Sequence, residues 1–133
     1  MKKPQYMISQ LTKAIEIGSG DHQNYYERGV ARFELQDYQG SIADFAKALE
    51  IDPKNKWCYL YSGIAKMGII DYQGAIADIN RAIELSPMFS AAYYSRGLLN
   101  IELGQIANGH LDLNKASELS NTRIFDGIDI NCN

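Results

Sequence analysis

The sequence has few of the residues that build metal sites and disulfide scaffolds. Its 133 residues include two cysteines, Cys58 and Cys132, and two histidines, His22 and His110. Two cysteines so far apart in the chain form neither a disulfide framework nor a zinc cluster. The histidines are 88 residues apart in sequence, which argues against a shared metal. We therefore expect no metal and no cofactor.

Basic residues and long apolar runs are also scarce. The 13 lysines and arginines are outnumbered by 16 acidic residues, giving a net charge of −3, whereas a nucleic-acid binder needs concentrated positive charge. No run approaches the roughly 18 apolar residues that a membrane-spanning helix needs. Residues 1–3 resemble the start of a signal peptide, but residues 4–6 (PQY) follow where an apolar run belongs. The sequence thus predicts a cytoplasmic protein that binds neither nucleic acid nor membrane.

What the sequence does have is an internal repeat. Residues 37–44, DYQGSIAD, recur almost letter for letter as residues 71–78, DYQGAIAD, an offset of 34 residues. The same offset relates Pro53 to Pro87, Gly29 to Gly63 and Gly97, and Tyr25 to Tyr59 and Tyr93. Chance does not produce such a register, so the chain is predicted to be a repeat protein.

Each copy of the repeat carries two apolar patterns of helical period. In the first copy, Ile42, Phe45 and Leu49 lie at the spacing of one buried helix face. Asp37 interrupts the pattern before them. Pro53 ends the second pattern, because the residue before a proline is pushed out of the helical region. Each unit is therefore predicted to be a helix, a short turn and a second helix.

A helix–turn–helix unit of this length resembles the tetratricopeptide repeat. In that family an aromatic residue and a glycine mark the first helix, and a small residue, an aromatic residue and a closing proline mark the second. The matching residues are Tyr25, Gly29, Ser41, Phe45 and Pro53 in the first copy, Tyr59, Gly63, Ala75, Ile79 and Pro87 in the second, and Tyr93, Gly97, Gly109 and Leu113 in the third. The third copy departs from the pattern at Asn121, where a proline is expected.

The resemblance implies a single all-α domain, a right-handed α-solenoid. We expect helix–turn–helix repeats over residues 22–55, 56–89 and 90–123, after an N-terminal capping helix over residues 4–17. Residues 124–133 are expected to form a short capping helix or a tail. Ile124, Phe125 and Ile128 suffice for a closing helix that covers the last apolar face.

In this family the first helices of successive repeats line a concave groove that binds peptides or helices. By that resemblance the partner-binding groove consists of Tyr26, Val30, Phe33, Trp57, Leu60, Ile64, Met67, Tyr94, Leu98 and Ile101. An open stripe of this kind rivals the largest apolar patch on a typical soluble monomer, about 300–600 Å². We therefore expect another protein, bound as a peptide or helix, to cover it. The competing interpretation is that these residues pack within the chain.

Family members that hold chaperone tails do so with a cluster of lysine, asparagine and arginine in the groove. The corresponding positions are held here by Tyr26, Val30, Tyr61, Ala91 and Ser95. The sequence therefore argues against the acidic tails of the large chaperones as partners.

Two arginines, Arg28 and Arg96, stand where the family usually has a leucine before the repeat glycine. Aspartates recur on the second helix, Asp44 and Asp112 among them, so one interpretation is an ion pair between the two helices of a repeat. The alternative is an arginine that grips a ligand carboxylate with its bidentate geometry.

The sequence shows no convergent set of acids, bases and nucleophiles. Residues 18–20 (GSG) lack the preceding strand and the Lys–Ser/Thr ending of a phosphate-binding loop. We therefore expect no enzyme activity, and a role as an adaptor, scaffold or assembly factor. Two alternatives stay open. One is a homo-oligomer whose groove is occupied by a second copy, and the other is an accessory domain of a larger enzyme complex.

Overall fold

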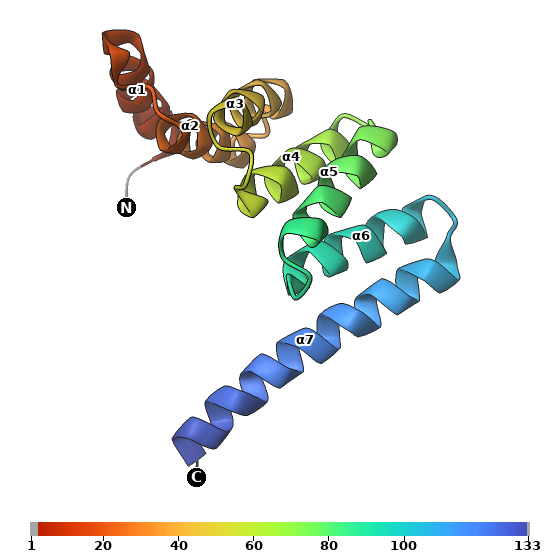
Figure 1. The fold of residues 1–133 in the computed structure, drawn as a ribbon. Coiled ribbons are helices and arrows are strands. Elements are labelled where there is room, and N and C mark those ends of the chain that lie inside the picture. Colours follow the sequence, from red (N-terminus) through yellow and green to blue (C-terminus); the bar gives the residue numbers. More distant parts are fainter. Residues whose placement is uncertain (1–2, 133) are drawn as a thin grey trace.

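The computed structural model describes residues 3–132, and their side chains over residues 3–18 and 20–121. Every regular element in this part of the chain is a helix (Figure 1). The helices are α1 (Pro4–Ala14), which continues as a π-helical turn (Ile15–Ser19), α2 (His22–Glu34), α3 (Tyr38–Ile51), α4 (Lys56–Gly68), α5 (Tyr72–Leu85), α6 (Ser90–Glu102) and α7 (Ile106–Cys132). The predicted all-α solenoid is confirmed.

The repeated DYQG sequence works as a helix start. The side chain of Asp37 accepts a hydrogen bond from the backbone N–H of Gly40 at 3.0 Å, which begins α3. Asp71 accepts the equivalent bond from Gly74, also at 3.0 Å, at the start of α5. A short carboxylate at this position satisfies an amide that has no partner within the helix.

The repeated glycine lets the two helices of a pair approach closely. A Cβ atom at Gly29 in α2 would lie 2.6 Å from Cε1 of Phe45 in α3. A Cβ atom at Gly63 in α4 would lie 2.8 Å from Cγ1 of Ile79 in α5. Both distances are too short for a real contact, so a side chain at either position would push the pair apart.

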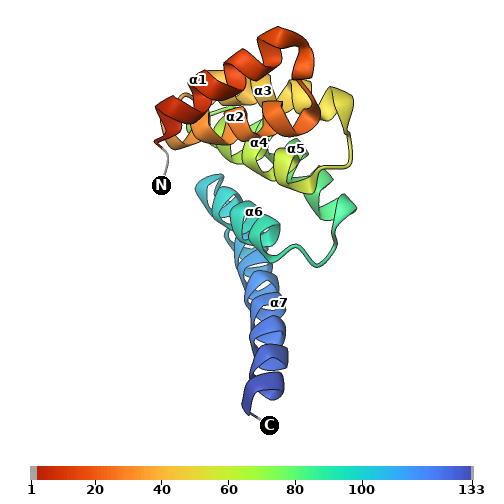
Figure 2. The same cartoon turned by 90° about the vertical axis from the view of Figure 1, so that its left-hand side faces the viewer.

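Successive helix pairs stack on one another, with each first helix against the second helix before it (Figures 1 and 2). α1 takes the place of such a second helix at the N-terminal end. Arg28 in α2 donates a hydrogen bond to Thr12 Oγ1 in α1 at 3.1 Å, just as Arg96 in α6 donates to Asn80 Oδ1 in α5 at 2.9 Å. Thr12 and Asn80 hold the same register position, so α1 packs against α2 as α5 packs against α6.

The turn between the two helices of a pair needs a left-handed residue. Gln36, Ile70 and Gly104 lie at the same register position and have φ of 62°, 63° and 83°. Glycine adopts this conformation freely, whereas a β-branched residue does not. The turn between α4 and α5 is therefore strained at Ile70.

The C-terminal end differs from the prediction. α3 and α5 have 14 residues each and end just before Pro53 and Pro87, whereas α7 has 27 residues and passes through Asn121 without a break. Proline ends a helix because it clashes with the preceding turn and has no N–H to donate. Asparagine does neither, so α7 continues and projects beyond the other helices (Figures 1 and 2).

No separate closing helix is therefore present over residues 124–132 of the described backbone. The side chains of Ile124, Phe125 and Ile128, which the sequence predicts to cover the last apolar face, lie outside the described residues.

Candidate functional site

A polar cluster joins the two helices of the first pair. Asp44 in α3, whose side chain is only 3% exposed, accepts hydrogen bonds from Arg28 at 2.7 and 2.9 Å and from Arg32 at 3.0 Å. The hydrogen bonds to the Asp44 carboxylate raise the pKa of Arg28 above its ordinary value. Both guanidinium groups are thus held within the repeat.

The same cluster recurs in the other two pairs. Arg96 binds Asp112 with two hydrogen bonds of 2.8 Å, and the pKa of Arg96 is raised for the same reason. In the second pair Lys66 and the hydroxyl of Ser62 contact Asp78, each at 2.8 Å. The interpretation of the arginines as partners of the repeat aspartates is confirmed, so they are not free ligands for a bound carboxylate.

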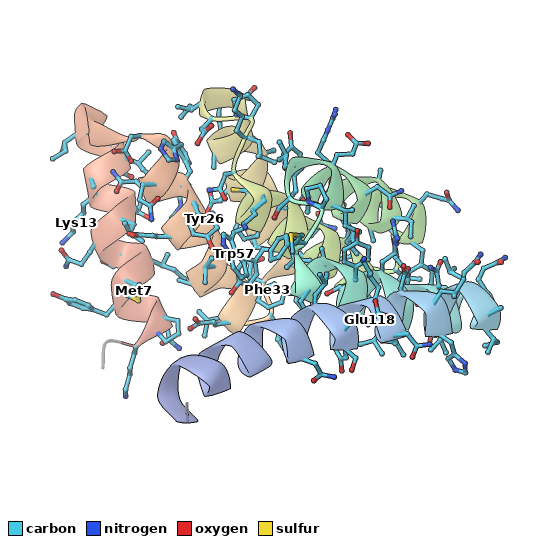
Figure 3. The ribbon with its side chains drawn as sticks, turned by 60° about the horizontal axis from the view of Figure 1, so that its bottom comes forward. Met7, Lys13, Tyr26, Phe33, Trp57 and Glu118 are labelled. Atoms are coloured by element: carbon cyan, nitrogen blue, oxygen red, sulfur yellow. The ribbon has the colours of Figure 1, made fainter. Side chains whose placement is uncertain are left out.

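A cluster of aromatic rings fills the junction between the first and second pairs. Tyr61 in α4 is its centre, with ring centroids 5.4 Å from Phe33, 6.0 Å from Phe45 and 6.2 Å from Tyr26. Burial, and next the neighbouring Tyr61, raise the pKa of Tyr26 to about 12. Figure 3 shows Tyr26, Phe33 and Trp57 gathered near the middle of the molecule. These rings pack mostly on one another.

The predicted groove residues fall into three classes of exposure. Trp57, Tyr94 and Leu98 are open to solvent, with 44%, 54% and 42% of their surface exposed. Six others are half-buried: Tyr26, Val30, Phe33, Ile64, Met67 and Ile101. Leu60 is a correction, because it is 3% exposed and belongs to the core between the second and third pairs. Leu60 therefore offers a partner no accessible surface.

The exposed residues Trp57 and Tyr94 line a cleft of about 660 Å³ between α4, α6 and α7. The cleft is mostly apolar. Its other lining residues are Lys56, Met88, Phe89, Ser90, Ala91, Leu113, Ala116, Ser117 and Ser120. The Trp57 ring lies edge-on to Phe89, with 4.7 Å between centroids, and forms one wall. We call the space that these residues line the cleft.

Met88 and Phe89 line the cleft but are not among the groove residues predicted from the sequence. Both follow Pro87 in the connection between α5 and α6. Two large apolar residues in a short turn were the signal that was available, because such residues are usually buried against something.

A family model described as tetratricopeptide repeat matches residues 23–55. The Arabidopsis OM64 TPR domain is 30% identical in sequence over 71% of this chain and 78% of that domain, with a TM-score of 0.68. The chain belongs to the tetratricopeptide repeat family.

Other tetratricopeptide repeat structures share the fold at lower identity. A crystal structure of MamA superposes with a TM-score of 0.85 and 23% identity over 91% of this chain and 71% of MamA. The second TPR of Spaghetti (RPAP3), bound to the HSP90 peptide SRMEEVD, superposes with a TM-score of 0.71 and 23% identity over 74% of this chain and 92% of that one. A search of curated proteins by sequence gave no match.

Among the described residues, no three histidine, cysteine, aspartate or glutamate side chains gather in a way that could hold a metal ion. Within that same part of the chain, no helix combines the length and the apolar character needed to cross a membrane.

Proposed function

We propose that this protein is a non-catalytic interaction module that binds a peptide or helix of another protein in its concave groove. The observation that carries the proposal is the apolar cleft, with Trp57 and Tyr94 on its walls and half of each side chain open to solvent. Aromatic residues in this setting are the type that dominates binding energy at interfaces. Leu98 extends the open surface along α6.

The energetics favour an extended or helical partner over a very short peptide. Burying Trp57, Tyr94 and Leu98 at about 1.5–3 kcal/mol each gives roughly 5–9 kcal/mol. Association costs about 4 kcal/mol or more, so these three residues alone support binding weaker than micromolar. A partner that also covers the half-buried residues beside them would bind more tightly.

The proposed partner is apolar, because the groove lacks basic groups where an acidic tail would need them. The second TPR of Spaghetti (RPAP3), which has a similar fold, binds the HSP90 peptide SRMEEVD. Here the corresponding positions include Tyr26 and Tyr61, which pack on each other with 6.2 Å between ring centroids. Among the described side chains, Lys56 is the one charged residue that lines the cleft.

The test begins with selection of peptides from a display library on the full chain. Trp57 is the single tryptophan of the sequence, so its fluorescence reports directly on occupation of the cleft. We expect apolar helical peptides to be enriched and to shift the Trp57 emission, and SRMEEVD to bind much more weakly. A preference for SRMEEVD would contradict the proposal.

Calorimetric titration of the best peptide then locates the site. We expect Trp57→Ala to weaken binding by about 2 kcal/mol, roughly 30-fold. Leu111→Ala is the matched control, since Leu111 is a 66% exposed apolar residue outside the cleft. Equal losses in the two variants would place the binding surface elsewhere.

A further inference from the structure

The last helix pair leaves more of one face open than the earlier pairs do, although Ala116 within this face is only 5% exposed. We call Tyr94, Leu98, Ile101, Leu113, Ala116 and Ser117 the end face. The counterparts of Tyr94 at the same register position are Tyr26, which is half-buried, and Leu60, which is 3% exposed, whereas Tyr94 is 54% exposed. Leu113 is half-buried, while its counterparts Phe45 and Ile79 are 0% exposed.

The difference arises because a following helix covers the earlier faces. Cys58 and Tyr61 of α4 pack against Phe45 of the first pair. Phe89, just before α6, and Ala92 in α6 lie in one core cluster with the second pair. The end face is therefore shaped to receive a helix, and the cleft lies beside it, where Leu113, Ala116 and Ser117 line both.

The chain carries a segment suited to this position. Residues 124–132 follow the start of α6 by the 34-residue repeat, so they stand in the register of a next first helix. They are helical, but as the straight continuation of α7, which carries them away from the end face of their own chain (Figures 1 and 2). Residues 122–132 span about 16 Å as a helix, against about 20 Å for the 13 residues of α6.

The charges of the two surfaces are complementary. Lys56, the one charged residue that lines the cleft, donates a hydrogen bond to Ser86 Oγ at 3.3 Å and forms no ion pair within the described residues. The sequence of the segment includes Asp126 and Asp129 against a single basic residue, Arg123.

The direction in which a helix must run on the end face is the one that a two-fold dimer provides. Each first helix runs antiparallel to the second helix before it, so a helix seated on the end face runs antiparallel to α7. A two-fold axis perpendicular to α7 makes the α7 helices of two copies antiparallel in the same way. Both end faces are then covered at once, which closes the assembly.

We propose that the end face binds the α7 extension, residues 122–132, of a second copy of this chain, so that two copies exchange these segments reciprocally. The exchange stands apart from the proposed function, because it needs no foreign partner. The two are linked through the cleft, since an exchanged segment and a partner peptide would compete for it.

Light scattering on a size-exclusion column, over a tenfold range of concentration, tests the exchange. We expect the full chain to approach twice the 14.9 kDa of one copy. Leu98→Glu on the end face, and a variant with serine at Ile124, Phe125 and Ile128, are each expected to be monomeric. Leu111→Glu is the matched control on the outer surface of α7 and should remain dimeric.

Mixing the two monomeric variants completes the test. The Leu98→Glu chain keeps an intact segment and the serine variant keeps an intact end face, so one of the two contacts re-forms and a heterodimer is expected. Asn121→Pro restores the helix stop of the other repeats and is expected to give a monomer whose segment covers its own end face. A full chain that is monomeric throughout, or variants that stay dimeric, would overturn the proposal. Either result leaves peptide binding to Trp57 untouched, so the two proposals fail separately.

Discussion

The junction after the first helix pair and the face after the third are built from the same register positions and differ in what covers them. Phe45 is fully buried and packs among the Tyr26 and Tyr61 rings. Its counterpart Leu113 is half-buried beside the exposed Tyr94. In a solenoid the burial of a residue is thus decided by whether another helix follows, and only secondarily by its own type.

The largest effect expected from this comparison is on unfolding. Phe45→Ala removes a fully buried ring and should lower the free energy of unfolding by about 3–5 kcal/mol. Leu113→Ala, with one side open, should lower it by about 1–2 kcal/mol. Urea denaturation followed by circular dichroism measures both. Equal losses would show that the two positions are covered alike.

The polar clusters give the next effect. Asp44→Asn leaves two half-buried arginines without their carboxylate, and we expect a loss of about 3 kcal/mol. Asp78→Asn should cost about 1–2 kcal/mol, because the Asp78 side chain is more exposed than that of Asp44, at 17% against 3%. Thermal unfolding of the two variants side by side ranks the clusters. The reverse order would contradict the role assigned to burial.

The turns supply a smaller effect of opposite sign. Ile70 has φ of 63° and is largely exposed, so Ile70→Gly should raise stability by about 1 kcal/mol. Gly104→Ala, at φ of 83°, should lower it by a similar amount. Chemical denaturation of both variants, compared with the parent, checks the pair. A destabilised Ile70→Gly variant would mean that the side chain makes a contact worth more than the strain.

The last effect is absent at neutral pH and appears only in alkaline solution. The pKa of Tyr26 is raised from 10.0 to about 12, so between these values the unfolded chain loses the proton that the folded chain keeps. Stability therefore falls as the pH rises from 10 to 12. Tyr26→Phe should flatten this fall while leaving neutral stability nearly unchanged. Unfolding midpoints measured across the alkaline range, with Tyr94→Phe as control, report the difference.

The repeat made most of the fold predictable from sequence. The recurring glycines allow close approach of two helices, the aspartates begin a helix and the prolines end one. Their spacing therefore predicts the helix pairs. The pairing of Arg28 with Asp44 followed from the same register. The course of α7 did not follow, because an asparagine at 121 permits either a turn or a continuing helix.

The groove was harder to predict than the fold. Sequence position tells which face of α4 a residue lies on, but not how closely α6 packs there, so Leu60 was taken for surface. Trp57 and Tyr94 are exposed because no helix covers them in the part of the chain whose side chains are described. The cleft walls Met88 and Phe89 come from an irregular connection, for which a helical period gives no guidance.

Cys58 can report how often the junction between the first and second helix pairs opens. The thiol is fully buried against Phe45 and Ala48, and burial raises its pKa to about 12, so the reactive thiolate is withheld while the junction is closed. With Cys132 replaced by serine, Cys58 is the one thiol left. The rate at which a thiol reagent labels Cys58 then measures how often α4 separates from the first helix pair by local unfolding.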